Sequence, residues 1–77
     1  MKTLKIMLST IVDVRDFVNA VVSYPGEVDL ASGRYVVDGK SIMGIFSLDL
    51  LNPIDMTIHS EHGAEQLLEK IDRFIVK

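Results

Sequence analysis

The chain has 77 residues, a formal net charge of −3 and no cysteine. A chain of this length is expected to form a single domain over residues 1–77 with a thin core, because a domain of about 60 residues buries only about 60% of the surface that its unfolded form exposes. The absence of cysteine excludes disulfides, thiolate catalysis and cysteine metal sites, and the scattered Lys and Arg residues form no basic cluster that would favour nucleic-acid binding.

The first predicted element is a strand over residues 3–8, in which the apolar Leu4, Ile6 and Leu8 alternate with other residues. The N-terminal sequence also alternates charged and apolar residues and lacks the uninterrupted apolar block of a secretory signal. No stretch of the chain approaches the length of a transmembrane helix. We therefore expect no membrane association and a cytoplasmic location.

A helix is predicted to begin after Thr10. Thr10 and Asp13 have the spacing of a capping box, in which a hydroxyl and a carboxylate satisfy the free N–H groups at a helix start. The sequence Tyr24-Pro25-Gly26 is expected to end this helix. The apolar residues between these signals recur at helical spacing and predict one buried face: Val14, Phe17, Val18, Val21 and Val22.

Two strands and a short helix are expected next. The strands cover residues 27–31 and 34–37, and the Ser32-Gly33 turn signal between them predicts a hairpin. Asp38-Gly39 closes the second strand. The following apolar residues Ile42, Ile45, Phe46 and Leu48 fit a short helix better than a strand.

The last two predicted elements are a strand and a helix. After an Asn52-Pro53 loop, Met56 and Ile58 alternate with polar residues as in a strand. From about Gly63 onward, one strongly amphipathic helix is predicted. Its apolar face consists of Ala64, Leu67, Leu68, Ile71, Phe74 and Ile75.

The order of these elements predicts an α/β (α+β) open-faced β-sandwich. Its sheet is four-stranded and mainly antiparallel, with two long helices and one short helix packed on a single face. The sheet face that we expect to meet the helices carries Leu4, Ile6, Val28, Leu30, Met56 and Ile58.

The sequence DGKSIMGIFSL, residues 38–48, resembles HPr, the histidine-containing phosphocarrier of the bacterial phosphoenolpyruvate-dependent sugar phosphotransferase system. The resemblance is strongest to the form found in Gram-positive bacteria, and the order of elements extends it over nearly the whole chain. It implies an HPr-like fold and places Ser41 on the family's regulatory serine, the target of the HPr kinase/phosphorylase.

The start of the first helix departs from that family. HPr proteins carry their phosphoryl-accepting histidine in a Gly-Leu-His-x-Arg-Pro-type motif. Counting back from the matching residues Phe17-Val18 puts Thr10 at the histidine position, with Val12 and Asp13 at the arginine and proline positions. No histidine occurs before position 59. The resemblance therefore implies a variant similar to catabolite-repression HPr, which carries no phosphohistidine, is not an enzyme and needs no cofactor.

Ser41 and its apolar neighbours form the candidate site. Ser41 is expected to be the N-cap of the short helix, exposed at its edge, and to be phosphorylated. A short helix can bury only one side, and Ile42, Met43 and Phe46 make this one apolar nearly all round, which favours a protein interface. Together with Lys40, they are the expected partner-binding residues. The expected partners are the HPr kinase/phosphorylase, a transcriptional regulator or components of the phosphotransferase system.

Two alternatives stay open. The first is a phosphocarrier with an unusual acceptor, Thr10, but a hydroxyl needs a base beside it whereas imidazole is nucleophilic unaided near pH 7. Asp13 would also repel a phosphate at the helix start, so a plain N-cap is favoured for Thr10. The second is an HPr-fold interaction module with an unrelated partner, in which Ser41 is only a helix cap.

The two histidines give little indication of a metal site. His59 falls on the polar side of the last strand, and His62 lies in the turn before the final helix. With Glu61 they could form a weak site, but two histidines and one carboxylate on a turn are poor support for one. We expect both to be solvated surface residues, and no metal to bind.

Overall fold

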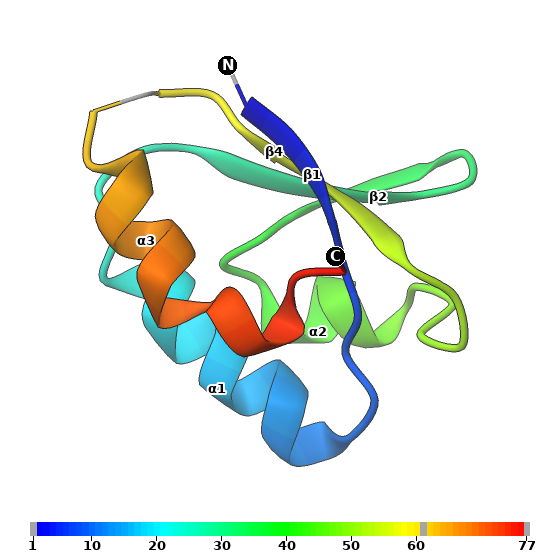
Figure 1. Ribbon diagram of the computed structural model, residues 1–77. Helices are drawn as coiled ribbons and strands as arrows, with labels where there is room; N and C mark the ends of the chain where they lie inside the picture. The colour runs from blue at the N-terminus through cyan, green and yellow to red at the C-terminus, as the bar shows by residue number, and fades with distance from the viewer. Residues whose placement is uncertain (1, 61, 77) are drawn as a thin grey trace.

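The computed structural model describes residues 2–60 and 62–76, and it shows one four-stranded antiparallel sheet with its helices on a single face (Figure 1). This arrangement confirms the predicted fold class. Among the described residues, no helix is long and apolar enough to cross a bilayer. The elements in chain order are β1 (Lys2–Ile6), α1 (Ile11–Val22), β2 (Val28–Ser32), β3 (Tyr35–Asp38), α2 (Ile42–Phe46), β4 (Ile54–Ile58), α3 (Ala64–Lys70) and the 3₁₀ helix η1 (Asp72–Phe74).

The strand order in the sheet is β1-β4-β2-β3, and every pairing is antiparallel. Met56 in β4 lies opposite Leu4 of β1 and Leu30 of β2. Residues that face each other across strands share one side of the sheet. The register therefore confirms the predicted apolar face, and it leaves β1 and β3 as the two edge strands.

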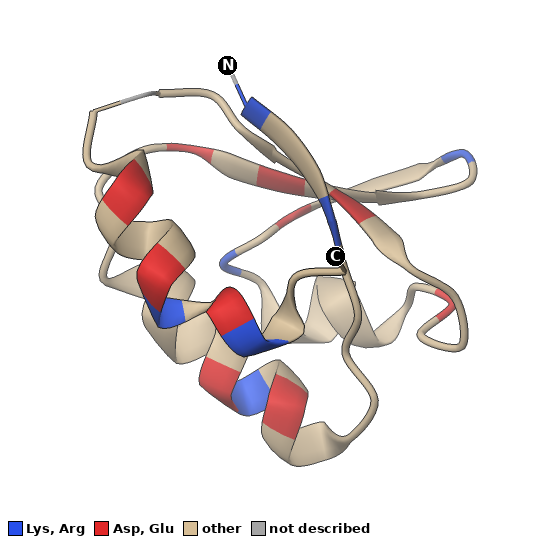
Figure 2. Cartoon of the chain, in the orientation of Figure 1, with Lys and Arg blue, Asp and Glu red and all other residues tan. Residues whose placement is uncertain are grey.

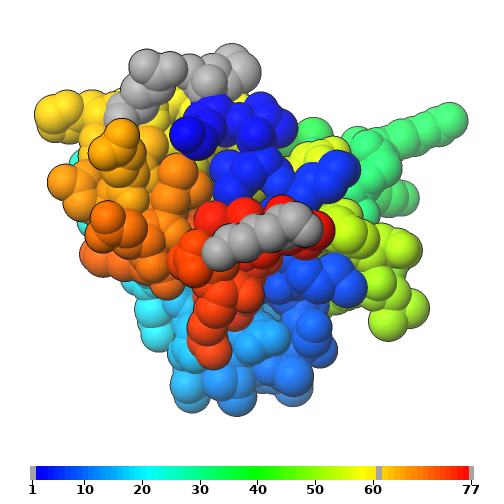
Figure 3. All heavy atoms as spheres, viewed as in Figure 1, coloured from blue at the N-terminus to red at the C-terminus, as the bar shows by residue number. Residues whose placement is uncertain are grey.

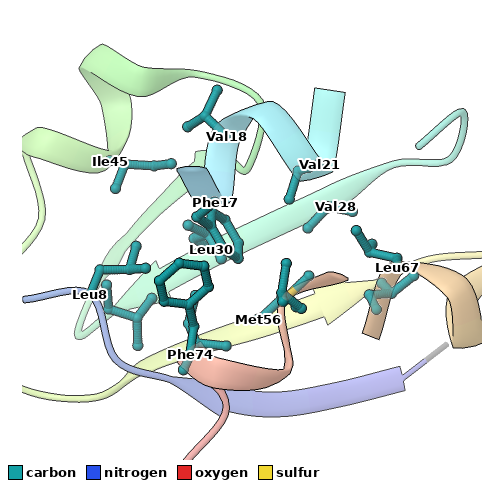
Figure 4. Packing of buried hydrophobic residues seen from close by; sticks show 14 of the residues in the cluster. Leu8, Phe17, Val18, Val21, Val28, Leu30, Ile45, Met56, Leu67 and Phe74 are labelled. Carbon is teal, nitrogen blue, oxygen red and sulfur yellow. The ribbon is translucent and has the colours of Figure 1, made fainter. Parts of the chain in front are cut away.

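The core lies between this apolar sheet face and the helices. Figure 4 shows Phe17 of α1 and Phe74 of η1 directed into the same space, beside Met56 of the sheet. The two phenyl rings meet edge to face, with centroids 6.1 Å apart and an interplanar angle of 78°. Phe17 is fully buried, so it connects α1 to both the sheet and the C-terminal segment.

Tyr24 fixes the end of α1 to the segment after β4. Its ring is buried, and its hydroxyl donates to the carbonyl oxygens of Ser60 at 2.8 Å and His62 at 3.1 Å. A buried phenol needs such partners, because an unpaired polar group in the core is costly.

Two predictions about α1 and the final helix are wrong in part. Val22 is 56% exposed, because it follows the buried Val21 by one position and so lies about 100° further around the helix. The predicted long final helix is two short ones. α3 ends at Lys70, after which Ile71 leaves helical geometry at φ −106° and ψ 13° and η1 begins. The break aims Phe74 into the core.

Smaller differences concern element ends. β1 ends at Ile6, so the buried Leu8 lies in the connection to α1 instead of in the strand. α2 ends at Phe46, and the buried Leu48 follows the helix instead of belonging to it. Both residues still join the core, because a connection next to a helix can insert an apolar side chain without regular structure.

Candidate functional site

Ser41 is the N-cap of α2, as predicted. Its Oγ accepts a hydrogen bond from the backbone N of Gly44 at 3.1 Å, and its carbonyl oxygen accepts one from the backbone N of Ile45 at 3.0 Å. Asp38 holds the turn before it, since its carbonyl oxygen accepts from Ser41 N at 3.0 Å and its Oδ1 accepts from Lys40 N at 2.9 Å. Ser41 is half-buried, so its predicted exposure is met only in part.

Gly44 allows α2 to lie close against β3. A Cβ at this position would stand 3.1 Å from Ser41 Oγ and 3.2 Å from Val37 Cβ, which is tighter than ordinary van der Waals contact. Ile45, the next residue, is fully buried and anchors the helix on the core. Gly44 and Ile45 together therefore fix how closely α2 packs against the sheet, and with it the position of the Ser41 hydroxyl.

The outward side of α2 is apolar and exposed. Ile42 is 37%, Met43 77% and Phe46 41% exposed, and we call these three residues the α2 surface. Figure 2 shows α2 without a charged residue, whereas α1 and α3 carry both signs. Lys40, just before the helix, is half-buried. The structure thus exposes the three apolar residues proposed for partner binding, and their binding role stays a prediction.

The start of α1 is closed by its own side chains. Thr10 Oγ1 accepts from Asp13 N at 3.0 Å, and Asp13 Oδ2 accepts from the backbone N of Ser9 at 3.1 Å and of Thr10 at 3.3 Å. The predicted capping box is confirmed. Because a carboxylate already receives these N–H groups, a phosphate at Thr10 would meet a negative charge instead of open donors.

The nearby arginines are directed at Asp16. Asp16 Oδ1 accepts from Arg15 Nη2 at 3.1 Å, and Asp16 Oδ2 accepts from Arg73 Nη2 at 2.7 Å. The hydrogen bond from Arg15, with added attraction from Arg73, lowers the pKa of Asp16 below its ordinary value of 3.8. Arg73 therefore ties the C-terminal segment to α1, Arg15 pairs within α1, and both guanidinium groups are directed at Asp16.

Sequence reasoning missed several exposed apolar residues outside α2, three of which lie at the start of α1 or just after α2. Ile11 is 73% and Val12 49% exposed in the first turn of α1, and Leu51 is 87% exposed after α2. A signal was present for Val12, which falls outside the helical spacing of the buried face of α1, but not for Ile11, which lies three residues before Val14 and so shares that face. α1 and α2 contact each other, so Ile11 and Val12 lie in the same helical layer as the α2 surface.

The histidines are exposed, as expected, but His59 also has a partner. Its Nε2 lies 2.6 Å from Oδ2 of Asp29 in β2, and His59 itself directly follows β4 instead of lying in the strand. The backbone N of His62 donates a hydrogen bond to Ser60 Oγ at 3.3 Å. Within residues 2–60 and 62–76, no group of three or more His, Cys, Asp or Glu side chains could hold a metal ion. Glu61 lies outside the described residues.

Known proteins resemble this chain in structure rather than in sequence. No family model matches the sequence, and no curated protein matches it. The solved structure of HPr-C-His from Thermoanaerobacter tengcongensis superposes with a TM-score of 0.79 and 20% identity, covering 95% of this chain and 89% of that one. The chain has the HPr fold.

A second solved structure leads to the same fold. The phosphocarrier protein HPr from Bacillus anthracis str. Ames gives a TM-score of 0.67 and 24% identity, covering 97% of this chain and 94% of that one. At these identities the likeness shows the fold alone. It confirms the HPr-like fold that the DGKSIMGIFSL segment and the order of elements predict.

Proposed function

We propose that the protein is a regulatory HPr-fold binding module related to the sugar phosphotransferase system, which contacts protein partners through the α2 surface and signals through Ser41. The observation that carries this proposal is the α2 surface itself. Ile42, Met43 and Phe46 are exposed on a helix without charge, directly after a hydroxyl at the helix start. Exposed apolar side chains grouped in this way are typical of protein interfaces.

Phosphorylation of Ser41 would change this surface without dismantling the fold. Ser41 Oγ attacks the γ-phosphorus of ATP, the bond to the ADP oxygen breaks, and the hydroxyl proton passes to a base of the kinase. The product adds between about −1.5 and −2 charges beside the α2 surface. No acidic residue lies in the first turn of α2 to repel it, and the ammonium group of Lys40 can partly neutralise it. An arginine on a partner could then recognise the phosphate.

The proposal excludes phosphohistidine transfer. Thr10 stands where the resemblance places the acceptor histidine, and the carboxylate of Asp13 accepts hydrogen bonds from two backbone N–H groups at that helix start. A threonine hydroxyl in such a cap lacks both an activating base and a cation for the incoming phosphate. The phosphocarrier alternative is therefore disfavoured. The alternative of an unrelated partner remains as an outcome of the experiment below.

The kinase reaction tests the proposal. We expect purified protein, incubated with HPr kinase/phosphorylase and ATP, to gain one phosphate that fragment mass spectrometry assigns to Ser41. Ser41→Ala should gain none. Ser47→Ala is the matched control, because Ser47 lies at the other end of α2 with its hydroxyl donated to Gly44 O at 2.6 Å. An unmodified wild type, or equal labelling of Ser41→Ala, would leave Ser41 as a helix cap and favour the unrelated partner.

The α2 surface can be tested in the same reaction. Met43→Ser removes an exposed apolar contact, and we expect kcat/KM for phosphorylation by the kinase to fall about tenfold, the loss of one buried apolar side chain at an interface. Val22→Ser is the matched control, since Val22 is equally apolar, 56% exposed and located at the far end of α1. Equal effects of both substitutions would contradict docking through the α2 surface.

A further inference from the structure

The two edges of the sheet differ in how much of their backbone is covered. Along β1, the C-terminal segment forms backbone hydrogen bonds from Met7 N to Phe74 O at 2.8 Å and from Val76 N to Lys5 O at 2.9 Å. Along β3, no described segment pairs with the outer side of the strand. An uncovered edge strand is a template for pairing with another strand.

The hairpin register shows which backbone groups face outward. Ser32 pairs with Tyr35 next to the turn, Leu30 pairs with Val37, and Gly39 N donates to Val28 O at 2.7 Å. Hydrogen-bonded and non-hydrogen-bonded pairs alternate along an antiparallel ladder, so the odd-numbered residues of this strand bond to β2. The N–H and C=O groups of Val36, and the N–H of Asp38, therefore point away from the sheet.

The side chains along this edge are exposed and largely apolar. Tyr35 is 72% and Val36 65% exposed. Figure 3 shows the tip of the β2–β3 hairpin projecting from the body of the molecule. Edge strands that avoid pairing usually carry an inward-pointing charge, a lysine or a proline, and residues 35–37 carry none of these.

We propose that β3 pairs with β3 of a second copy of this chain, antiparallel and centred on Val36. This inference goes beyond the proposed function. In that register each Val36 forms a hydrogen-bonded pair with its counterpart, and each Tyr35 lies across from a Val37. The sequence RYVVD, residues 34–38, is then self-complementary, because each Arg34 faces an Asp38 of the other copy.

The charges at the two ends of this segment support a second copy over another partner. Arg34 and Asp38 each form no ion pair with a described residue. Pairing two copies satisfies both charges twice, once at each end of the new ladder. Because only one short strand of each copy takes part, we expect the contact to fall below the roughly 1,200 Å² at which stable interfaces begin, and the dimer to be weak and concentration-dependent.

Two charge-reversal variants test the pairing. Sedimentation velocity over a concentration series should show a monomer–dimer equilibrium for the unmodified chain. Arg34→Glu and Asp38→Lys should each weaken self-association about tenfold, because each places like charges opposite one another at both ends. An equimolar mixture of the two variants should associate at least as tightly as the unmodified chain, since every facing pair in the mixed dimer is again opposite in charge.

Three controls keep the test decisive. Lys2→Glu makes the same change of charge on the other edge strand and should leave association unchanged. Circular dichroism should show native folding of each variant, and Asp38→Asn, which keeps an oxygen for Lys40 N, should weaken association less than Asp38→Lys. A chain that stays monomeric at every concentration, a mixture no tighter than its components, or an equal effect of Lys2→Glu would overturn the proposal.

Discussion

The two main helix starts of this molecule use the same kind of cap with opposite chemical consequences. Thr10 and Ser41 each accept a hydrogen bond from a backbone N–H three residues ahead, at 3.0 and 3.1 Å. At α1 the carboxylate of Asp13 accepts two further N–H groups. At α2 no acidic residue lies in the first turn.

This difference decides which helix start can accept an added anion. The α1 start holds its own negative charge, and its exposed neighbours are the apolar Ile11 and Val12. The α2 start has a hydroxyl and a preceding lysine, and its first turn holds no carboxylate; the carboxylate of Asp38 lies in the turn before it and accepts from Lys40 N. Capping residues of the same type therefore need not imply the same function, because the third residue of the helix determines the charge at its start.

The largest expected effect tests whether both helix starts depend on one core. Phe17→Ala should lower the free energy of unfolding by about 3–5 kcal/mol, because the ring is fully buried and leaves a cavity. Urea denaturation measures this, and Val22→Ala, on the exposed side of the same helix, should change it by less than about 0.5 kcal/mol. A loss below 1 kcal/mol for Phe17→Ala, by the scale of such cavities, would mean that the core is not shared as described.

A smaller effect compares the two caps directly. Thr10→Ala should lower the free energy of unfolding by about 1–2 kcal/mol, and Ser41→Ala should lower it by about 0.5–1 kcal/mol. The first effect is larger because removing the Thr10 hydroxyl also disrupts the reciprocal contact with Asp13. Thr10→Ser and Ser41→Thr keep a capping hydroxyl and serve as matched controls in the same urea titrations. The comparison is contradicted if Ser41→Ala lowers the free energy of unfolding more than Thr10→Ala does.

The smallest expected effect is a pH dependence of stability that arises from Asp16 in α1. The pKa of Asp16 is lowered below 3.8 by Arg15 and Arg73, so its contribution to stability is present above that value and lost as the pH falls through the folded-state pKa. Between about pH 5 and pH 2.5, the unmodified chain should lose slightly more unfolding free energy than Asp16→Asn. Equal losses in both proteins would show that these ion pairs contribute nothing measurable.

Much of the fold could be predicted because its signals are local. The alternation in β1 and β4 and the Thr10–Asp13 spacing each depend on a few neighbouring residues, and all are found, although β1 ends at Ile6 before the predicted Leu8. The break after Lys70 could not be predicted, because apolar residues at i and i+3 suit an α-helix and a 3₁₀ helix alike. The backbone angles of Ile71 show the break, and the packing of Phe74 against Phe17 accompanies it.

The parts of the candidate site that depend on neighbouring residues could also be predicted, whereas the contacts between separate strands could not. A serine before an apolar run predicts both the cap and the exposed α2 surface, since five helical residues cannot bury every side. The pairing of His59 with Asp29 depends on the register between β4 and β2, and the uncovered β3 edge depends on the strand order. Neither the strand register nor the strand order is encoded within a single segment, so sequence patterns alone do not predict them.

The difference between the two helix starts can be tested most directly by offering the protein both phosphoryl donors and locating the phosphate. One sample receives phosphoenolpyruvate and the first enzyme of the phosphotransferase system, and the other receives ATP and HPr kinase/phosphorylase. We predict no label in the first sample and a single acid-stable phosphate on Ser41 in the second, as read by fragment mass spectrometry. An acid-labile label from phosphoenolpyruvate, or phosphate on Thr10 in either sample, would contradict this account of the two helix starts.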